Sequence, residues 1–148
     1  MSARFAIAIL AVLLTAAGPA CADLKQALAE PNLEKRSKLA LDNASAQLRH
    51  VKEAYQKGDL DAVRDRAAEA LESVEVAAKA LKDTGKDPRR SPKWFKKAEM
   101  ETRDLARRIE AVQQDMSYSD RPMLDALHAK TQQVHDDLLM GLMEGKRK

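Results

Sequence analysis

The fold is decided by residues 60–81, which read LDAVRDRAAEALESVEVAAKAL. Apolar residues recur there at alternating spacings of three and four positions, the pattern of one buried face on an α-helix. Those positions are Leu60, Val63, Ala67, Ala70, Val74, Ala77 and Leu81. Such a sustained spacing is typical of long helices that pack side by side at a small angle, as in coiled coils and bundles. We therefore expect a helix over residues 60–83.

A second helix is expected immediately before this one, over residues 33–57. Gly58 can adopt the left-handed conformation that ends a helix, and Asp59 can cap the helix that follows. A connection this short forces the two helices to be antiparallel neighbours. Asn32 is a suitable N-cap for the earlier helix, and a short amphipathic lead-in over residues 23–30 precedes it.

Two further helices are expected downstream, over residues 92–116 and 121–144. Ser91 followed by Pro92 is a typical helix start, because serine can cap a helix and proline lacks an N–H that would go unpaired there. Four helices of similar length with short connections predict an all-α fold, an antiparallel up-down-up-down four-helix bundle with coiled-coil-like packing. The alternative is a three-helix core whose fourth helix is exchanged between two copies.

Residues 1–22 have the pattern of a secretory signal peptide. Arg4 precedes an apolar run over residues 5–14, and the small-residue sequence ACA at residues 20–22 matches a signal peptidase site. The run is too short for a retained transmembrane helix, which needs about 20 apolar residues. We expect cleavage of this segment, a single helical domain over residues 23–148, and an exported protein that is periplasmic or secreted.

Cys21 leaves one alternative open, because a cysteine after an apolar run can become the lipidated N-terminus of a bacterial lipoprotein. Such signals usually have a leucine three residues earlier, where this chain has Gly18. We therefore expect a mature chain that is not lipidated and has no cysteine. Its stability would then come from core packing and not from disulfides.

The charge composition argues against nucleic-acid binding. The full chain has 26 basic and 23 acidic residues. Residues 1–22 contain one base, Arg4, and no acid, so the mature chain has 25 bases and 23 acids, a net charge of +2. Nucleic-acid-binding domains usually carry a marked excess of Lys and Arg on one face. No stretch of the expected mature chain has the length of apolar sequence that spans a membrane.

No catalytic motif is evident, and we expect the protein not to be an enzyme and to hold no cofactor. A catalytic site needs a nucleophile beside a base, or paired acids in a cleft. The acids of this chain are dispersed along the helices and alternate with bases. That arrangement is typical of a solvated, ion-paired surface.

A metal- or haem-binding bundle is an alternative function. His128 and His135 lie seven residues apart on one face of the last expected helix, and Asp125 lies one turn before His128. A further ligand could come from His50 or from an acid of a facing helix. Di-metal bundles use Glu-x-x-His on two helices with two further glutamates, a set that this chain lacks. The two histidines are therefore an incomplete ligand set.

The connection before the third long helix has the most unusual composition. Residues 86–97, KDPRRSPKWFKK, contain six bases, one acid and the only tryptophan of the chain. The start of a helix is the positive end of its dipole and prefers acids, so these bases carry a cost. Broken local rules often mark functional sites, and helix N–H groups with converging bases can bind anions. The candidate partner- or anion-binding residues are Lys86, Arg89, Arg90, Lys93, Trp94, Lys96 and Lys97.

We therefore expect an exported, non-catalytic binding or interaction protein of the bacterial cell envelope, with residues 86–97 as its contact. Its partner would be an acidic envelope protein, an anionic lipid or a glycan. The bases also fit a simpler role, in which they keep an exposed connection soluble and pair with acids such as Asp83 and Asp87. A self-associating helical oligomer is the remaining alternative.

Overall fold

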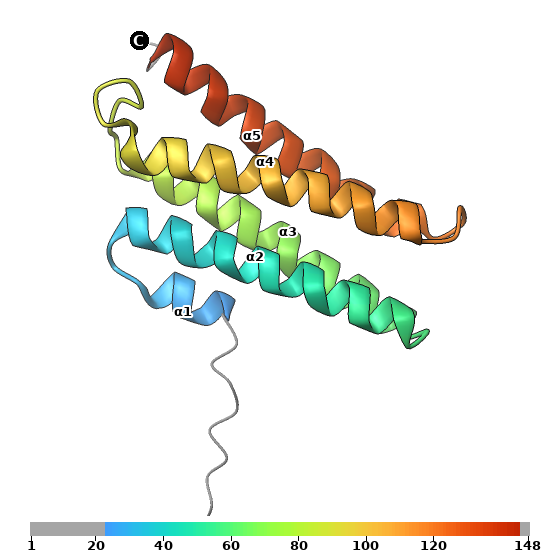
Figure 1. Cartoon of the computed structure of the whole chain (residues 1–148). Coiled ribbons are helices and arrows are strands. Elements are labelled where there is room, and N and C mark those ends of the chain that lie inside the picture. Colours follow the sequence, from blue (N-terminus) through green and yellow to red (C-terminus); the bar gives the residue numbers. More distant parts are fainter. Residues whose placement is uncertain (1–22, 146–148) are drawn as a thin grey trace, which may run out of the picture.

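The computed structural model describes residues 23–145. The elements along the chain are α1 (Leu24–Ala29), α2 (Leu33–Gln56), α3 (Leu60–Asp83), α4 (Pro92–Asp115), the 3₁₀ turn η1 (Arg121–Leu124) and α5 (Asp125–Glu144). The four long helices pack against one another, which confirms the predicted all-α helical bundle (Figure 1). The expected signal peptide and Cys21 lie outside the described residues. Among residues 23–145, no helix combines the length and the apolarity that crossing a membrane requires.

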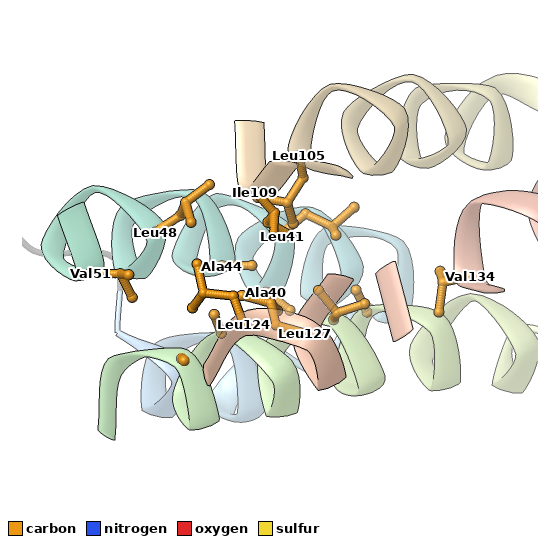
Figure 2. Close-up of a cluster of buried hydrophobic side chains, with 14 of the residues drawn as sticks. Ala40, Leu41, Ala44, Leu48, Val51, Leu105, Ile109, Leu124, Leu127 and Val134 are labelled. Carbon is orange, nitrogen blue, oxygen red and sulfur yellow. The ribbon is translucent and has the colours of Figure 1, made fainter. Parts of the chain in front are cut away.

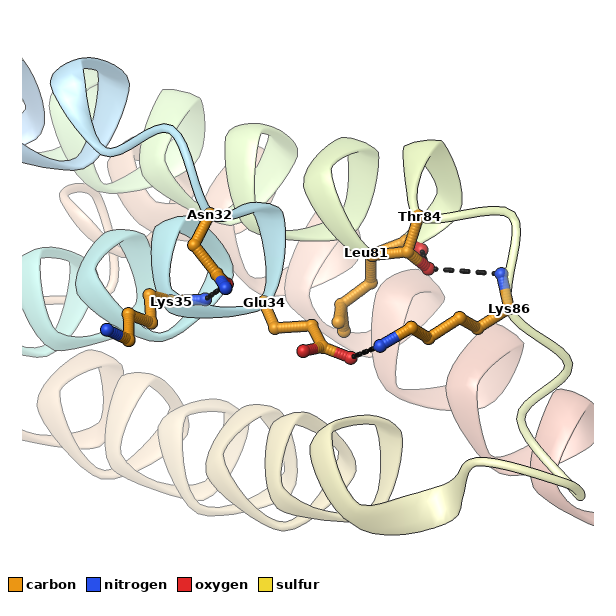
Figure 3. Close-up of polar contacts among 6 residues, drawn as sticks. All are labelled: Asn32, Glu34, Lys35, Leu81, Thr84 and Lys86. Atoms are coloured by element: carbon orange, nitrogen blue, oxygen red, sulfur yellow. Dashed lines mark hydrogen bonds and ion pairs between the residues drawn. The ribbon is translucent and has the colours of Figure 1, made fainter.

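Helices α2 and α3 form a tight antiparallel hairpin. Gly58 joins them with a φ of +75°, a left-handed conformation that glycine adopts at little cost. The Asp59 carboxylate accepts a hydrogen bond from the backbone N–H of Ala62 at 3.0 Å and caps α3 as predicted. Asn32 caps α2 in the same way by accepting the N–H of Lys35 at 2.9 Å (Figure 3).

The two helical hairpins, α2–α3 and α4–α5, pack against each other. Helix α4 lies beside α2 and α5 lies beside α3, whereas the consecutive helices α3 and α4 barely touch. Helix direction alternates along the chain as expected, so each of these lateral pairs is parallel. Residues 84–91 must therefore cross the end of the bundle from one corner to the opposite corner (Figure 1).

The core is built from the apolar repeats of the four long helices. In α3 the repeat positions from Val63 to Leu81 are buried, and Leu60 is half-buried. Leu41 of α2 belongs to the same cluster as Leu105 and Ile109 of α4, and all three are at most 3% exposed (Figure 2). Many of the buried positions of α2 and α3 are alanine, which allows these two helices to approach closely.

A buried polar cluster between α2 and α3 has no counterpart in the sequence prediction. Asn43 is fully buried, and its amide donates to Ser73 Oγ at 2.9 Å and to Glu69 Oε1 at 3.1 Å. The amide of Gln47 donates to the same Glu69 oxygen at 3.1 Å. Because these polar groups satisfy one another, the cluster favours a single register of α2 against α3.

The last long helix differs from the prediction at its start. A helix is expected over residues 121–144, but Arg121–Leu124 form a 3₁₀ turn and the α-helix begins at Asp125. Asp120 makes no capping hydrogen bond to this turn, because its carboxylate accepts from the Tyr55 hydroxyl at 3.0 Å. A helix start without a capping side chain commonly tightens into 3₁₀ geometry.

Candidate functional site

The candidate residues 86–97 lie at one end of the bundle, in the connection from α3 to α4 and in the first turns of α4 (Figure 1). Asp87 organises this connection. Its carboxylate accepts the backbone N–H of Arg89 at 2.9 Å, and its carbonyl accepts the N–H groups of Arg90 and Ser91 at 3.1 and 2.9 Å. The single acid of the segment therefore stabilises the backbone turn of this connection through hydrogen bonds, and it forms no ion pair with the described residues.

The start of α4 lacks the predicted capping hydrogen bond. Ser91 is at the N-cap position and Pro92 follows it as expected, but the serine side chain makes no hydrogen bond to the helix. Its torsions, φ −129° and ψ 63°, lie outside the extended region that is usual for a cap. The first turn also contains no acid. The positive end of the α4 dipole is therefore left uncompensated beside Lys93.

Most cations of this segment have no acidic partner in the described part of the chain. Lys86 is the exception, because its Nζ lies 2.6 Å from Glu34 Oε1 of α2 (Figure 3). Asp83 is instead paired with Lys79, one turn earlier in α3. Neither Asp83 nor Asp87 thus pairs with these bases. Within residues 23–145, no ion pair is formed by Arg89, Arg90, Lys93, Lys96 or Lys97.

Trp94 is half-buried and packs against the core at this end of the bundle. It borders Ser37 and Leu41 of α2. The ammonium groups of Lys93 and Lys97 lie 5.5 and 5.8 Å from the centre of its ring, a cation–π arrangement. The indole therefore serves as a packing surface on which two exposed lysines rest.

One acid of α4 has a perturbed pKa near this end. Burial raises the pKa of the Glu101 carboxyl, and the carboxylate of Asp42 raises it further, while Lys97 and Lys38 oppose the change. Lys38 is hydrogen-bonded to Asp42, which raises the pKa of the lysine ammonium. The charges of α2 and α4 are therefore coupled across their contact.

A groove of about 710 Å³ adjoins the basic segment and was not predicted from the sequence. It lies between the C-terminal half of α3 and most of α5, from Lys130 onward, and ends at the α3–α4 connection. Its floor is apolar and contains Ala78, Leu81, Phe95, Val134 and Leu138. Its rim contains the bases Lys79, Lys82, Lys86 and Lys130 and the acids Glu75 and Asp137. The apolar floor is thus bordered by charged side chains, among which bases outnumber acids by four to two.

Gly141 of α5 and Gly145, directly after it, allow the connection to rest against the end of that helix. A Cβ atom at Gly141 would lie 3.3 Å from the Pro88 ring, and one at Gly145 would lie 2.9 Å from the Arg89 side chain. This close approach brings Lys86 to the end of the groove. A pair of glycines four residues apart at the end of a helix is the sequence signal that could have indicated the contact.

The histidines of the metal-site hypothesis lie in different surroundings. His135 is half-buried between α5 and α4, where its Nδ1 lies 3.5 Å from Oε1 of the buried Glu99. Arg103 lies 3.8 Å from the same carboxylate. His128 takes no part in this cluster, and His50 lies on α2. In the described part of the chain, no three His, Cys, Asp or Glu side chains are placed to hold one metal ion.

Comparison with known proteins gives no match to a protein-family model, to a curated protein or to a solved structure. The function must therefore be inferred from the chain's own residues. We call residues 86–97 together with the groove between α3 and α5 the basic end. It is the feature whose charge and shape are least explained by folding alone.

Proposed function

We propose that the protein is an exported, non-catalytic binding protein whose basic end engages an anionic partner in the cell envelope. The observation that carries this proposal is the set of exposed cations in residues 86–97, five of which form no ion pair with the described residues. Neighbouring like charges repel one another, and an anion placed between them removes that repulsion. Such a cluster therefore attracts anionic partners and raises their rate of association.

Export is supported by the sequence pattern of residues 1–22, with its apolar run and small-residue cleavage site. A binding role is supported by the side chains present at the basic end. Ammonium and guanidinium groups donate hydrogen bonds to carboxylates and phosphates, whereas catalysis would require a nucleophile or an acid–base pair beside them.

The test is a crosslinking pull-down from envelope extract with the mature chain, residues 23–148, as bait. A variant with Arg89→Glu, Arg90→Glu and Lys93→Glu carries three acids in place of three unpaired bases. We expect the natural chain to capture a partner that this variant does not capture. Capture should also weaken as salt is added, since exposed charges are screened.

The matched control reverses three exposed bases outside the basic end, through Arg49→Glu, Lys57→Glu and Arg107→Glu. This control has the same net charge as the test variant. It should capture the partner as the natural chain does. If the test variant captures the partner as well as the control does, the basic end is not the binding surface.

Self-association is a second candidate function, favoured by the outer surface of α5. Leu139, Met140 and Met143 are 41%, 46% and 71% exposed, a concentration of apolar area at the C-terminal half of one helix. Exposed apolar clusters often mark interfaces. Sedimentation over a range of concentrations tests this candidate, and a monomer at every concentration would exclude it.

A further inference from the structure

The floor of the groove between α3 and α5 is formed by residues of the core. Four residues of its floor, Leu81, Phe95, Val134 and Leu138, are each at most 9% exposed and belong to the core cluster. Ala78, at the α3 side, is half-buried and too small to cover them. An apolar ligand that lies on this floor would gain free energy mainly by removing its own apolar surface from water.

The two ends of the groove differ in charge. At the inner end, Lys130 Nζ of α5 lies 3.9 Å from Glu75 Oε1 of α3, so an ion pair crosses from one helix to the other. At the outer end, Lys86 from the connection and Lys82 from α3 both reach the groove. Lys82 forms no ion pair with the described residues, and Lys86 is paired with Glu34 alone. The inner end is therefore neutralised by its own ion pair. The groove lining as a whole contains four bases and two acids, Glu75 and Asp137. Of the four bases, Lys82 is the one that forms no ion pair with the described residues.

We infer that this groove binds a long-chain fatty acid, with its acyl chain on the apolar floor and its carboxylate at Lys82 and Lys86. The inference rests on the proposed function, because it names the class of the anionic ligand. Lys82 offers an unpaired ammonium group to the carboxylate, and Lys86 offers a second donor that it shares with Glu34. An apolar surface with a few polar groups gathered at one end suits a ligand that is itself apolar along its length and charged at one end.

The size of the groove favours a single acyl chain. At roughly 30 Å³ per carbon atom, close to the liquid volume of one water molecule, the carbons of palmitate occupy about 480 Å³. The groove has a volume of about 710 Å³, which accommodates one such chain with space for water around the carboxylate. A phospholipid with two chains would need about twice the volume of palmitate.

A helix of a partner protein fits the groove less well. From Lys130 to Gly145 the groove follows α5 over about 22 Å, at 1.5 Å per residue. Because the ion pair between Lys130 and Glu75 crosses the inner end, a helix longer than about 15 residues would have to break it. A chain with one charged end can instead stop short of that ion pair.

The test is isothermal titration calorimetry of the delipidated mature chain, residues 23–148, with palmitate below its micellar concentration. We expect one palmitate per chain. Myristate, which is two methylenes shorter, should bind more weakly by up to about 15-fold, the ratio for two fully buried methylenes at about 0.8 kcal/mol each. Cetyltrimethylammonium has a chain of the same length and a cationic head, and it should bind at least about 10-fold more weakly than palmitate.

Two variants locate the site. Ala78→Phe places a large side chain in the groove and should weaken palmitate binding by at least about 10-fold. Ala68→Phe makes the same substitution at an exposed position of the same helix and should leave binding unchanged. Lys82→Gln removes the unpaired cation at the outer end, so it should narrow the difference in affinity between palmitate and cetyltrimethylammonium. Circular dichroism checks that each variant is folded.

The inference is overturned if palmitate does not saturate at one site, if a folded Ala78→Phe variant binds it normally, or if the two amphiphiles bind the natural chain equally. The pull-down separates this failure from failure of the proposed function. A partner that is captured through Arg89, Arg90 and Lys93 without any palmitate binding would leave the proposed function standing and refute the fatty-acid site. If no partner depends on those bases and palmitate does not bind, both are wrong.

Discussion

The cations in the first turns of α4 should lower the stability of the fold, and Lys93 allows this effect to be measured. Lys93 follows Pro92 at the positive end of the helix dipole, in a helix with no capping side chain and no acid in its first turn. Its ammonium also lies 5.5 Å from the centre of the Trp94 ring. Lys93→Gln removes the charge and this contact, and Lys93→Glu does the same and adds an acid.

The difference in unfolding free energy between these two variants is therefore the contribution of an acid at this position. An acid in the first turn of a helix stabilises it by roughly 0.3–1 kcal/mol. The introduced carboxylate can also pair with Lys97, one turn later, for roughly 0.2–0.5 kcal/mol. At low salt we expect Lys93→Glu to be more stable than Lys93→Gln by about 0.5–1.5 kcal/mol.

Urea unfolding followed by far-ultraviolet circular dichroism measures this difference. With a denaturant slope of about 2 kcal/mol per molar urea, it corresponds to a midpoint shift of about 0.25–0.75 M. High salt should reduce the shift, because both contributions are between exposed charges. Binding of the anionic partner should fall in both variants, and further in Lys93→Glu, so the more stable protein would be the poorer binder.

The reasoning is refuted if Lys93→Glu is no more stable than Lys93→Gln, or if salt leaves the difference unchanged. A natural chain more stable than either variant would show that the contact between Lys93 and Trp94 outweighs the unfavourable dipole. In that case the lysine would stabilise the fold, and its position would be no indication of binding.

Three substitutions test other parts of the structure. Gly145→Ala should lower the unfolding free energy by about 1–3 kcal/mol. The backbone torsions of Gly145, φ 79° and ψ −171°, disfavour any side chain, and the new Cβ would meet Arg89 at 2.9 Å. An unchanged urea midpoint would contradict this prediction. Asn43→Ala should lower the unfolding free energy by about 1–3 kcal/mol, because Ser73 and Glu69 lose a buried hydrogen-bond donor. Thermal unfolding measures this loss of stability. An unchanged melting temperature would be evidence against the buried cluster. Burial raises the pKa of Glu101 in the fold above its ordinary value of 4.5, so ionisation of this carboxyl destabilises the protein as the pH rises. Glu101→Gln should therefore be more stable than the natural chain at neutral pH and about equal to it near pH 4, which urea unfolding at the two pH values would show.

The long helices could be predicted because their signals are local. The repeat in residues 60–81 depends only on the geometry of one helix, and the turn at Gly58 and Asp59 depends on two residues. The choice of neighbours is not local. Helix α4 packs beside α2 and not beside α3, which precedes it in the chain, and this depends on how whole faces of side chains fit. The spacing of apolar residues contains no information about that fit.

The charge of the candidate site could be predicted from the sequence, but the contacts of its side chains could not. Lys86 is paired with Glu34, and Trp94 packs on α2, and both contacts join segments far apart in the chain. The groove has the same origin, because it forms between helices, with Ala78 of α3 and Gly141 of α5 both in its lining. Each of these small residues is ordinary in its own helix, and the space exists only after packing.

The diagonal course of residues 84–91 makes them the covalent link between two hairpins that otherwise meet through side chains. Each hairpin contains its own turn and mostly local contacts, a topology associated with rapid folding. We therefore expect two separate polypeptides, divided within this link, to recombine into the native bundle when mixed, with an affinity set by the shared core. The proposed binding segment would then lie at the junction of two folding units. Substitutions in that segment would leave the packing inside each hairpin unchanged.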